Sequence, residues 1–221
     1  MLSPEELSGL YLSAKVASVA TLFCLPFAIC LGWMLARYEF RSKFLLEAML
    51  QLPMVLPPVV LGYVLLVLFS PQGWIGQVLA HWGIELAFNW KGAVLAAMLV
   101  AFPLLVQMLN PQLEQVAASL GAAPLKVFFS ISLPLVLPGI LMGSILGFSR
   151  SLGEFGATIT FVGNIPDETR TIPIAIYTLI QQPDGEAAAM RLVLLSTGLA
   201  FAALLANYFI LHRYQRKLGQ N

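Results

Sequence analysis

The sequence predicts an all-α membrane protein, a polytopic helical bundle with about five transmembrane helices. The first observation is composition: 59% of the 221 residues are hydrophobic and 10% are charged, whereas about a quarter of the residues in a soluble domain are charged. The second is that several long apolar runs alternate with short polar loops, which leaves no length for an extramembrane domain. We therefore expect residues 1–221 to form a single transmembrane domain.

Charge and cysteine content exclude several other classes. A net charge of +1 gives no overall field that would attract nucleic acid, so we expect no nucleic-acid partner. Cys24 and Cys30 lie in one apolar run and, six positions apart on a helix, face different directions. We expect no disulfide, no metal site and no cofactor. The first ten residues carry acids and no basic segment, so no cleaved signal peptide is expected.

The first apolar run, Leu10–Ala36, is long enough to cross the bilayer with a tilt. Arg37, Arg41 and Lys43 follow it directly, which by the positive-inside tendency puts this end in the cytoplasm and the N-terminus outside. The last run, Met190–Leu211, also ends in basic residues and supports a cytoplasmic C-terminus. Five spans satisfy every loop, and a sixth would reverse the orientation of the basic tail.

The second run, Leu45 to Phe69, contains Pro53, Pro57 and Pro58. Each proline removes a backbone donor and frees a carbonyl that lipid cannot satisfy. Two interpretations stay open: a kink that only shapes packing, and a bent helix that lines a substrate path. The loop that follows, Ser70–Lys91, holds three tryptophans suited to a membrane interface.

The segment Glu114–Pro134 has helical patterning and polar residues, and it separates the apolar runs Gly92–Leu109 and Leu133–Leu152. Because both runs end at this segment, it lies on one membrane surface, which the basic loops assign to the cytoplasm. A short helix presented there is placed to contact a soluble partner. An ordinary amphipathic helix in the interface is the alternative.

The fourth run continues as a helix beyond Leu152, and it contains Arg150 and Glu154, which are four apart and able to pair on one helix face. A charge inside a membrane run is costly unless it faces a cavity or a partner, so this pair is a candidate for function. A structural ion pair is the alternative. Four nearby hydroxyls can donate weak hydrogen bonds to an oxyanion: Ser149, Ser151, Thr158 and Thr160.

Two motifs resemble a known family. Gly121, Ile131, Leu133 and Pro134 reproduce the glycine and I-x-L-P spacing of the cytoplasmic coupling loop of ABC-importer permeases. The stretch SRSLGEFGATITFVGNIPDETRTIPIAIYTLI is similar to the corresponding stretch of molybdate permeases, while sulfate permeases share its LGEFGA core. The chain departs from the family where the usual Glu-Ala-Ala is Gln-Val-Ala, and the segment before Glu114 is shorter by roughly two helical turns.

The resemblance implies the type I ABC importer permease fold, in the bacterial plasma membrane. It implies a dimer of this chain, two cytoplasmic ABC ATPases and an extracytoplasmic oxyanion-binding protein. It implies a coupling loop at about 110–132, with contacts to the ATPase by Glu114, Gln115, Ala117, Gly121, Ala122, Leu125, Phe128 and Pro134. It also implies an outer loop and short helix at about 163–186, where Asp167, Glu168 and Arg170 contact the binding protein; a merely solvated polar loop is the alternative.

No sequence feature indicates an enzyme. The chain has no G-x-x-x-x-G-K-[ST] phosphate loop, so ATP hydrolysis is expected on a separate subunit. Three hypotheses remain: a permease subunit for molybdate, with tungstate as a related anion; the same machine for sulfate or thiosulfate; and a stand-alone channel or secondary transporter in which Arg150 and Glu154 form a gate. Competition by sulfate separates the first two, and transport without an ATPase identifies the third.

Overall fold

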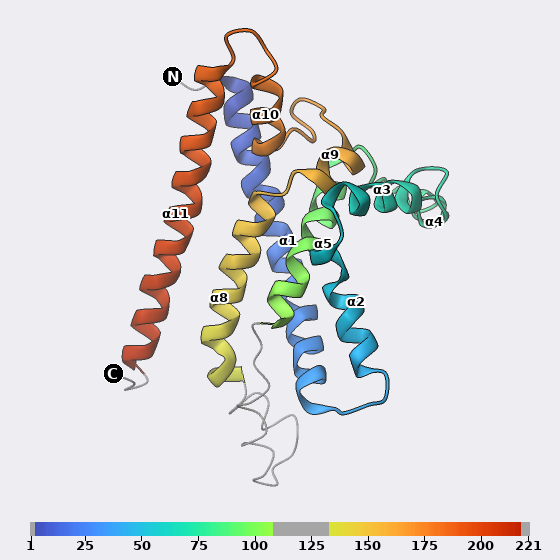
Figure 1. The fold of residues 1–221 in the computed structure, drawn as a ribbon, viewed down its shortest axis with the longest axis vertical. Helices are drawn as coiled ribbons and strands as arrows, with labels where there is room; N and C mark the ends of the chain where they lie inside the picture. The colour runs from blue at the N-terminus through green and yellow to red at the C-terminus, as the bar shows by residue number, and fades with distance from the viewer. Residues whose placement is uncertain (1–2, 108–132, 218–221) are drawn as a thin grey trace.

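The computed structural model describes residues 3–107 and 133–217, and in these ranges every regular element is an α-helix. The helices are α1 (Pro4–Arg37), α2 (Lys43–Val55), α3 (Pro58–Phe69), α4 (Trp74–Ala80), α5 (Trp90–Gln107), α8 (Leu133–Leu152), α9 (Gly156–Val162), α10 (Ile172–Leu179) and α11 (Glu186–Lys217). We call the end that carries the start of α1 with α9 and α10 the upper end, and the end that carries the α1–α2 loop and the start of α8 the lower end (Figure 1).

The described chain has three helices that could each cross a membrane, and one bent pair that could cross as a unit. Helices α1, α5 and α11 are each long and apolar enough to cross a membrane. Helices α2 and α3 meet that criterion only as a pair, bent by 108°, and α8 has 20 residues, about the length that crosses the hydrocarbon. The prediction of an all-α membrane bundle is confirmed for the described residues, with three spans, or four if the bent pair is one span, and α8 as a shorter apolar helix.

Helix α1 begins earlier than its apolar run. The Ser3 side chain accepts a hydrogen bond from the Glu6 backbone N–H, and the Glu6 carboxylate accepts one from the Ser3 backbone N–H. This capping box satisfies donors that the first turn of a helix would otherwise leave unpaired. Pro4 occupies the first helical position, where its missing N–H costs nothing.

The core lies where α1 and α5 cross, and small side chains make that contact close. Ala17 and Ala20 of α1 and Ala93 and Ala97 of α5 have no exposed surface. Small residues let helix backbones approach, so that van der Waals contact holds the pair together in lipid. Helix α8 packs against both α1 and α5, whereas α11 packs against α8 and α10 and stands at the edge of the bundle (Figure 1).

The second predicted run is broken, not kinked. Leu56 and Pro57 each precede a proline, which excludes the helical region for both, and their ψ values are 139° and 131°. Two consecutive extended residues turn the chain, and α3 and α4 project sideways from the bundle (Figure 1). Helix α4, inside the predicted 70–91 loop, was not expected from the sequence.

The fourth predicted run is also broken, which corrects the expectation of one continuous helix past Leu152. Helix α8 ends at Leu152, and three residues separate it from α9. The break follows a pattern of two glycines, Gly153 and Gly156, around Glu154 and Phe155. The short helix expected before Pro183 is present as α10.

Candidate functional site

The two breaks lie close together at the upper end, and the charged pair predicted from the sequence lies at one of them. Arg150 Nη1 donates to Glu154 Oε2 at 2.9 Å. Glu154 is outside α8, in a turn where its backbone N–H donates to the Ser151 carbonyl. The predicted pairing is therefore confirmed, but it spans a helix end and not one helix face. The Glu154 side chain is 2% exposed and that of Arg150 is 39% exposed.

The second carboxylate oxygen of Glu154 holds the next helix. Oε1 accepts the Ala157 backbone N–H at 2.9 Å, in the first turn of α9. One buried carboxylate thus connects a cation of α8 to the start of α9 across the break. Beside it, the Phe155 ring contacts the Tyr177 ring of α10, with centroids 5.1 Å apart. The linker is fixed on both sides, to the bundle and to the upper helix α10.

The four predicted hydroxyls divide between two helices. Ser149 and Ser151 lie in the last turn of α8, and their hydroxyl oxygens are buried without a hydrogen-bond partner among the described residues. Thr158 is buried in α9, and the Thr160 hydroxyl donates to the Gly156 carbonyl of its own helix at 2.8 Å. The sequence predicted one helix that carries all four hydroxyls, and the structure instead places two on α8 and two on α9.

Glycines bring α3 and α9 into direct backbone contact. A Cβ placed on Gly62 of α3 would lie 2.5 Å from the Ala157 carbonyl oxygen and 2.8 Å from the Thr160 Cβ. A Cβ on Gly156 would lie 2.7 Å from the Pro58 Cβ. Helix α3, which follows the first break, therefore packs directly against α9, which follows the second.

The three prolines predicted to line a path are separated by the break. Pro58 contacts α9 at Gly156, next to the charged pair, while Pro53 lies half-buried inside α2. Pro57 and Pro58 are exposed in the single chain. Of the three, Pro58 is the one that the contacts place beside α9.

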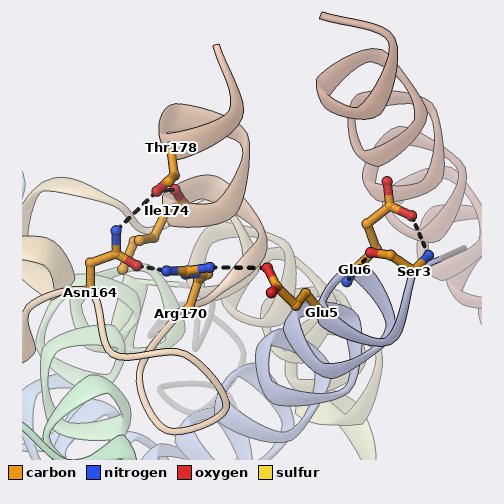
Figure 2. Close-up of polar contacts among 7 residues, drawn as sticks. All are labelled: Ser3, Glu5, Glu6, Asn164, Arg170, Ile174 and Thr178. Carbon is orange, nitrogen blue, oxygen red and sulfur yellow. Dashed lines mark hydrogen bonds and ion pairs between the residues drawn. The ribbon is translucent and has the colours of Figure 1, made fainter. Parts of the chain in front are cut away.

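The loop predicted to contact a binding protein is held by polar contacts at the upper end (Figure 2). Arg170 Nε donates to Asn164 Oδ1 at 2.8 Å, and its Nη1 donates to Glu5 Oε2 at 3.3 Å. Asn164 Nδ2 in turn donates to the Thr178 hydroxyl of α10 at 2.9 Å. The Thr169 hydroxyl accepts the Ile165 backbone N–H at 2.9 Å. Arg170 thus joins the loop to α1, and its side chain is 20% exposed.

The three charged residues of this loop have different surroundings. Glu168 is half-buried, and its Oε1 accepts the Trp90 backbone N–H of α5 at 3.4 Å. Asp167 is exposed and has a φ of 61°, a left-handed conformation that Asp tolerates better than most residues. Of the predicted trio, Asp167 is the one whose side chain the loop leaves exposed.

Sequence reasoning missed a second ion pair beside this loop. Arg191 of α11 donates to Glu6 at 2.8 Å, so the first turn of α1 holds α11 as well as the loop. A cavity of about 190 Å³ lies between these segments, lined in part by Glu5, Arg170 and Arg191. The S-x-x-E pattern of residues 3–6 is a capping-box signature and was the available signal for this helix start. Nothing local in the sequence identified the distant arginines.

Another missed contact joins α1 to α5. Lys15 Nζ lies 3.6 Å above the centre of the Trp90 ring, a cation–π arrangement within an otherwise apolar stretch of α1. Trp90 therefore contacts a lysine of α1, whereas Trp74 and Trp82 are largely exposed.

The predicted coupling residues lie almost entirely outside the described residues. These are Glu114, Gln115, Ala117, Gly121, Ala122, Leu125 and Phe128. Pro134 is the second residue of α8. The described helices on either side of this segment place the end of α5 and the start of α8 at the lower end, where the α1–α2 loop also lies (Figure 1).

Residues 28–217 match the model of the family described as binding-protein-dependent transport system inner membrane component. The chain belongs to this family. It is thus a multi-pass membrane component of an ABC transport system, as the sequence motifs predicted.

Within this family, the chain is similar over nearly its whole length to molybdenum transport permeases. The chain is 51% identical over 228 residues to the "Molybdenum transport system permease protein ModB" of Escherichia coli (strain K12), with both chains covered completely. It is 49% identical over 223 residues to the protein of that name from Haemophilus influenzae, with 97% of each chain covered. The predicted resemblance to molybdate permeases is confirmed. A "Probable sulfate transport system permease protein cysT" of Nephroselmis olivacea is 35% identical over 195 residues, covering 85% of this chain and 69% of the relative.

Solved structures share the fold. The inward-facing MetNI methionine ABC transporter matches with a TM-score of 0.74 at 16% identity, covering 97% of this chain and 99% of that one. A bacterial ABC transporter that imports the acidic polysaccharide alginate matches with a TM-score of 0.67 at 18% identity, covering 96% and 80%. The predicted type I ABC importer permease fold is confirmed by these matches.

Proposed function

We propose that this chain is the permease subunit through which an ATP-driven ABC importer moves molybdate, with tungstate as a related anion, into the cytoplasm. The observation that carries the proposal is the 51% identity over the whole chain to a relative named as a molybdenum transport permease. The chain's SRSLGEFGATITFVGN stretch, similar to molybdate permeases beyond the LGEFGA core, supports the same anion.

The second candidate is a permease for sulfate or thiosulfate. The 35% identity to a relative named as a probable sulfate permease favours it. Both anions are tetrahedral and doubly charged, so the same donors serve either. A stand-alone channel or secondary transporter is the third candidate. It requires that this chain works without the binding protein on which its family's transport systems depend.

The proposed machine contains two copies of this chain in the lipid bilayer, two cytoplasmic ABC ATPases and an extracytoplasmic oxyanion-binding protein. The absence of a P-loop motif from the sequence supports ATP hydrolysis on a separate subunit. A related-fold transporter has been solved with a bound periplasmic protein, which supports a partner of that kind. Helix α2 has no buried residue in the single chain, which supports its burial against a second copy.

The proposed path for the anion passes the two breaks. A guanidinium that is 39% exposed at the end of α8 supports a role for Arg150 in that path, with Glu154 and the nearby hydroxyls of Ser149, Ser151, Thr158 and Thr160 around it. Pro58 beside α9, together with Pro57 and Pro53, shapes the α2–α3 side. The lower segment 110–132 is the proposed ATPase contact.

The upper loop is the proposed contact for the binding protein. Asp167 is exposed and is the proposed direct contact, while Glu168 and Arg170 hold the loop through Trp90 and Glu5. This arrangement supports an outer position for the upper end, with the N-terminus outside and the C-terminus in the cytoplasm of a bacterial plasma membrane.

Uptake of radiolabelled molybdate tests the proposal directly. The assay uses right-side-out membrane vesicles that contain this chain and its ATPase. ATP is loaded inside the vesicles, and the binding protein is present outside. We expect ATP-dependent uptake that a hundredfold excess of sulfate does not displace. Vesicles that lack the ATPase are the control.

Each alternative outcome identifies another candidate. Uptake that excess sulfate abolishes assigns the chain to a sulfate system. Uptake that continues without the ATPase rejects the ABC mechanism and supports a stand-alone channel or secondary transporter.

A further inference from the structure

The Arg150–Glu154 pair differs from an ordinary structural ion pair because most N–H donors of its guanidinium have no hydrogen-bond partner among the described residues. A guanidinium carries five N–H donors, and among the described residues Arg150 makes one hydrogen bond, to Glu154. Its side chain is 39% exposed, while that of its partner is 2% exposed. The pair therefore presents a cation at the surface of the single chain and keeps its counter-ion inside.

In the carboxylate, in contrast, each oxygen accepts a hydrogen bond. Glu154 accepts from Arg150 with one oxygen and from the Ala157 backbone N–H with the other. Both contacts lie across the three-residue break between α8 and α9. Glu154 thus links the two helices across the break. While both contacts are intact, the end of α8 and the start of α9 keep their relative position.

We propose that a tetrahedral oxyanion replaces Glu154 on the Arg150 guanidinium, and that this exchange releases the α8–α9 break. The inference rests on the proposed function and deepens it. Glu154 occupies in the resting chain the position that the anion takes during transport. An oxyanion offers the guanidinium two parallel acceptors, the geometry that arginine recognises best.

The exchange cannot stay local because of where Glu154 lies. A carboxylate that is buried and loses its cation is strongly destabilised. The Glu154 side chain must therefore leave its buried position, and this movement weakens its hold on the Ala157 N–H. Gly153, which precedes Glu154, is exposed, and a Cβ placed there would meet only the Ser149 and Arg150 carbonyl oxygens, at 3.8 Å and 4.0 Å. Once Glu154 gives up its two contacts, the linker therefore has room to move at Gly153.

Two further observations fit an arrangement that is meant to change. The hydroxyls of Ser149 and Ser151 are buried beside the break without a partner among the described residues, a cost that a resting structure seldom keeps without a reason. Helix α8 also starts where the predicted coupling segment ends. The break therefore lies at the upper end of the same helix whose lower end follows the predicted ATPase contact.

Hydrogen exchange of the Ala157 amide measures this release. The permease is assembled with its ATPase in lipid nanodiscs, and exchange in residues 153–158 is compared in sodium molybdate and in sodium chloride of equal ionic strength. In the native sequence we expect molybdate to speed exchange of these amides about threefold or more, because the occupied guanidinium lowers the fraction of chains with the pair intact.

Two variants separate the roles of the pair. Arg150→Gln is expected to exchange rapidly without the anion and to ignore molybdate. Glu154→Gln keeps an oxygen for the Ala157 N–H but loses the charge that holds Arg150, so molybdate should bind it at least about threefold more tightly. Lys91→Gln removes one exposed cation at the start of α5 and should respond to molybdate as the native sequence does.

The outcomes distinguish this inference from the proposed function. Molybdate uptake by the native complex without any change in exchange overturns the inference and leaves the permease assignment standing. An Arg150→Gln complex that responds to molybdate as the native one does also overturns it. A response to sulfate and not to molybdate supports the exchange at Arg150 and moves the assignment to a sulfate system.

Discussion

At the scale of single residues, the contact between α3 and α9 depends on Gly62. A methyl group there would meet the backbone of Ala157 at 2.5 Å and 2.8 Å, and a backbone cannot move aside as a side chain can. Helix propensity alone would favour alanine over glycine by about 1 kcal/mol. The steric effect is the larger one, since overpacking in a closely packed contact costs about 1–3 kcal/mol.

We therefore expect Gly62→Ala to lower the unfolding temperature of the purified permease and its yield in the membrane. The matched control is Gly198→Ala in α11, where an added Cβ meets no atom within 4 Å. That variant should be as stable as the native chain or slightly more so. Equal unfolding temperatures for the Gly62 and Gly198 variants would show that α3 and α9 are not in close contact.

The sequence predicted some side-chain partners and not others for a physical reason. Arg150 and Glu154 are four residues apart, and local spacing sufficed to pair them even though the helix ends between them. Arg170 and Glu5 are 165 residues apart, and their contact depends on how α1 and the upper loop pack. Only the folded chain brings such residues together, so the sequence offered Arg170 as a free docking residue.

At the scale of elements, the turn between α2 and α3 depends on two adjacent prolines. Pro57 excludes the helical conformation at Leu56, and Pro58 excludes it at Pro57; the two extended residues give the 108° bend. Replacing one proline frees only one of these residues. The double variant Pro57→Ala/Pro58→Ala frees both, and the surrounding apolar sequence is then able to continue as one helix.

We expect the double variant to bring the α2–α3 angle closer to straight and to reduce uptake severalfold. Spin labels at Phe44 in α2 and Val67 in α3, both exposed side chains, report the change as an increase in their distance. Pro53→Ala, inside α2, is the control and should leave that distance unchanged. An unchanged distance in the double variant would mean that the contact of α3 with α9 sets the bend, and not the prolines.

The breaks also mark the limit of prediction for elements. Hydrophobic run length identified the spans α1, α5 and α11 because each is long and apolar. The same measure joined α8 to α9, since the apolar sequence continues through the Gly153–Phe155 linker and conceals the break. The break carries Gly153 and Gly156, and Glu154 accepts the Ala157 N–H at the start of α9, a local contact that hydropathy does not detect.

The coupling segment allows a prediction from the sequence alone. Gly121→Asp should leave the permease inserted in the membrane but abolish its co-purification with the ATPase, because bulk and charge are added where a partner backbone approaches closely. Gly219→Asp makes the same substitution in the terminal KLGQN segment and should co-purify normally. Normal co-purification of the Gly121 variant would show that the predicted ATPase contact lies elsewhere.

At the scale of the whole molecule, the two ends differ in the kind of charge they carry. The lower end has Arg41 and Lys43 at the α1–α2 loop and Arg213 near the end of α11. At the upper end, Arg170 and Arg191 are bound to acids of the first turn of α1. Because short loops rich in Lys and Arg stay in the cytoplasm, the lower end is expected to be cytoplasmic.

Labelling of single cysteines tests this orientation in intact cells. In a Cys24→Ala/Cys30→Ala background, Gln72→Cys in the α3–α4 loop should react with a membrane-impermeant maleimide from outside, because it is exposed and belongs to the upper half of the molecule. Arg41→Cys, equally exposed in the lower loop, should react only after the cells are permeabilised. The reverse pattern would place the coupling segment outside, where no ATP is available, and would reject the ABC importer mechanism together with the orientation. The test therefore bears on the function of the whole chain and not on its topology alone.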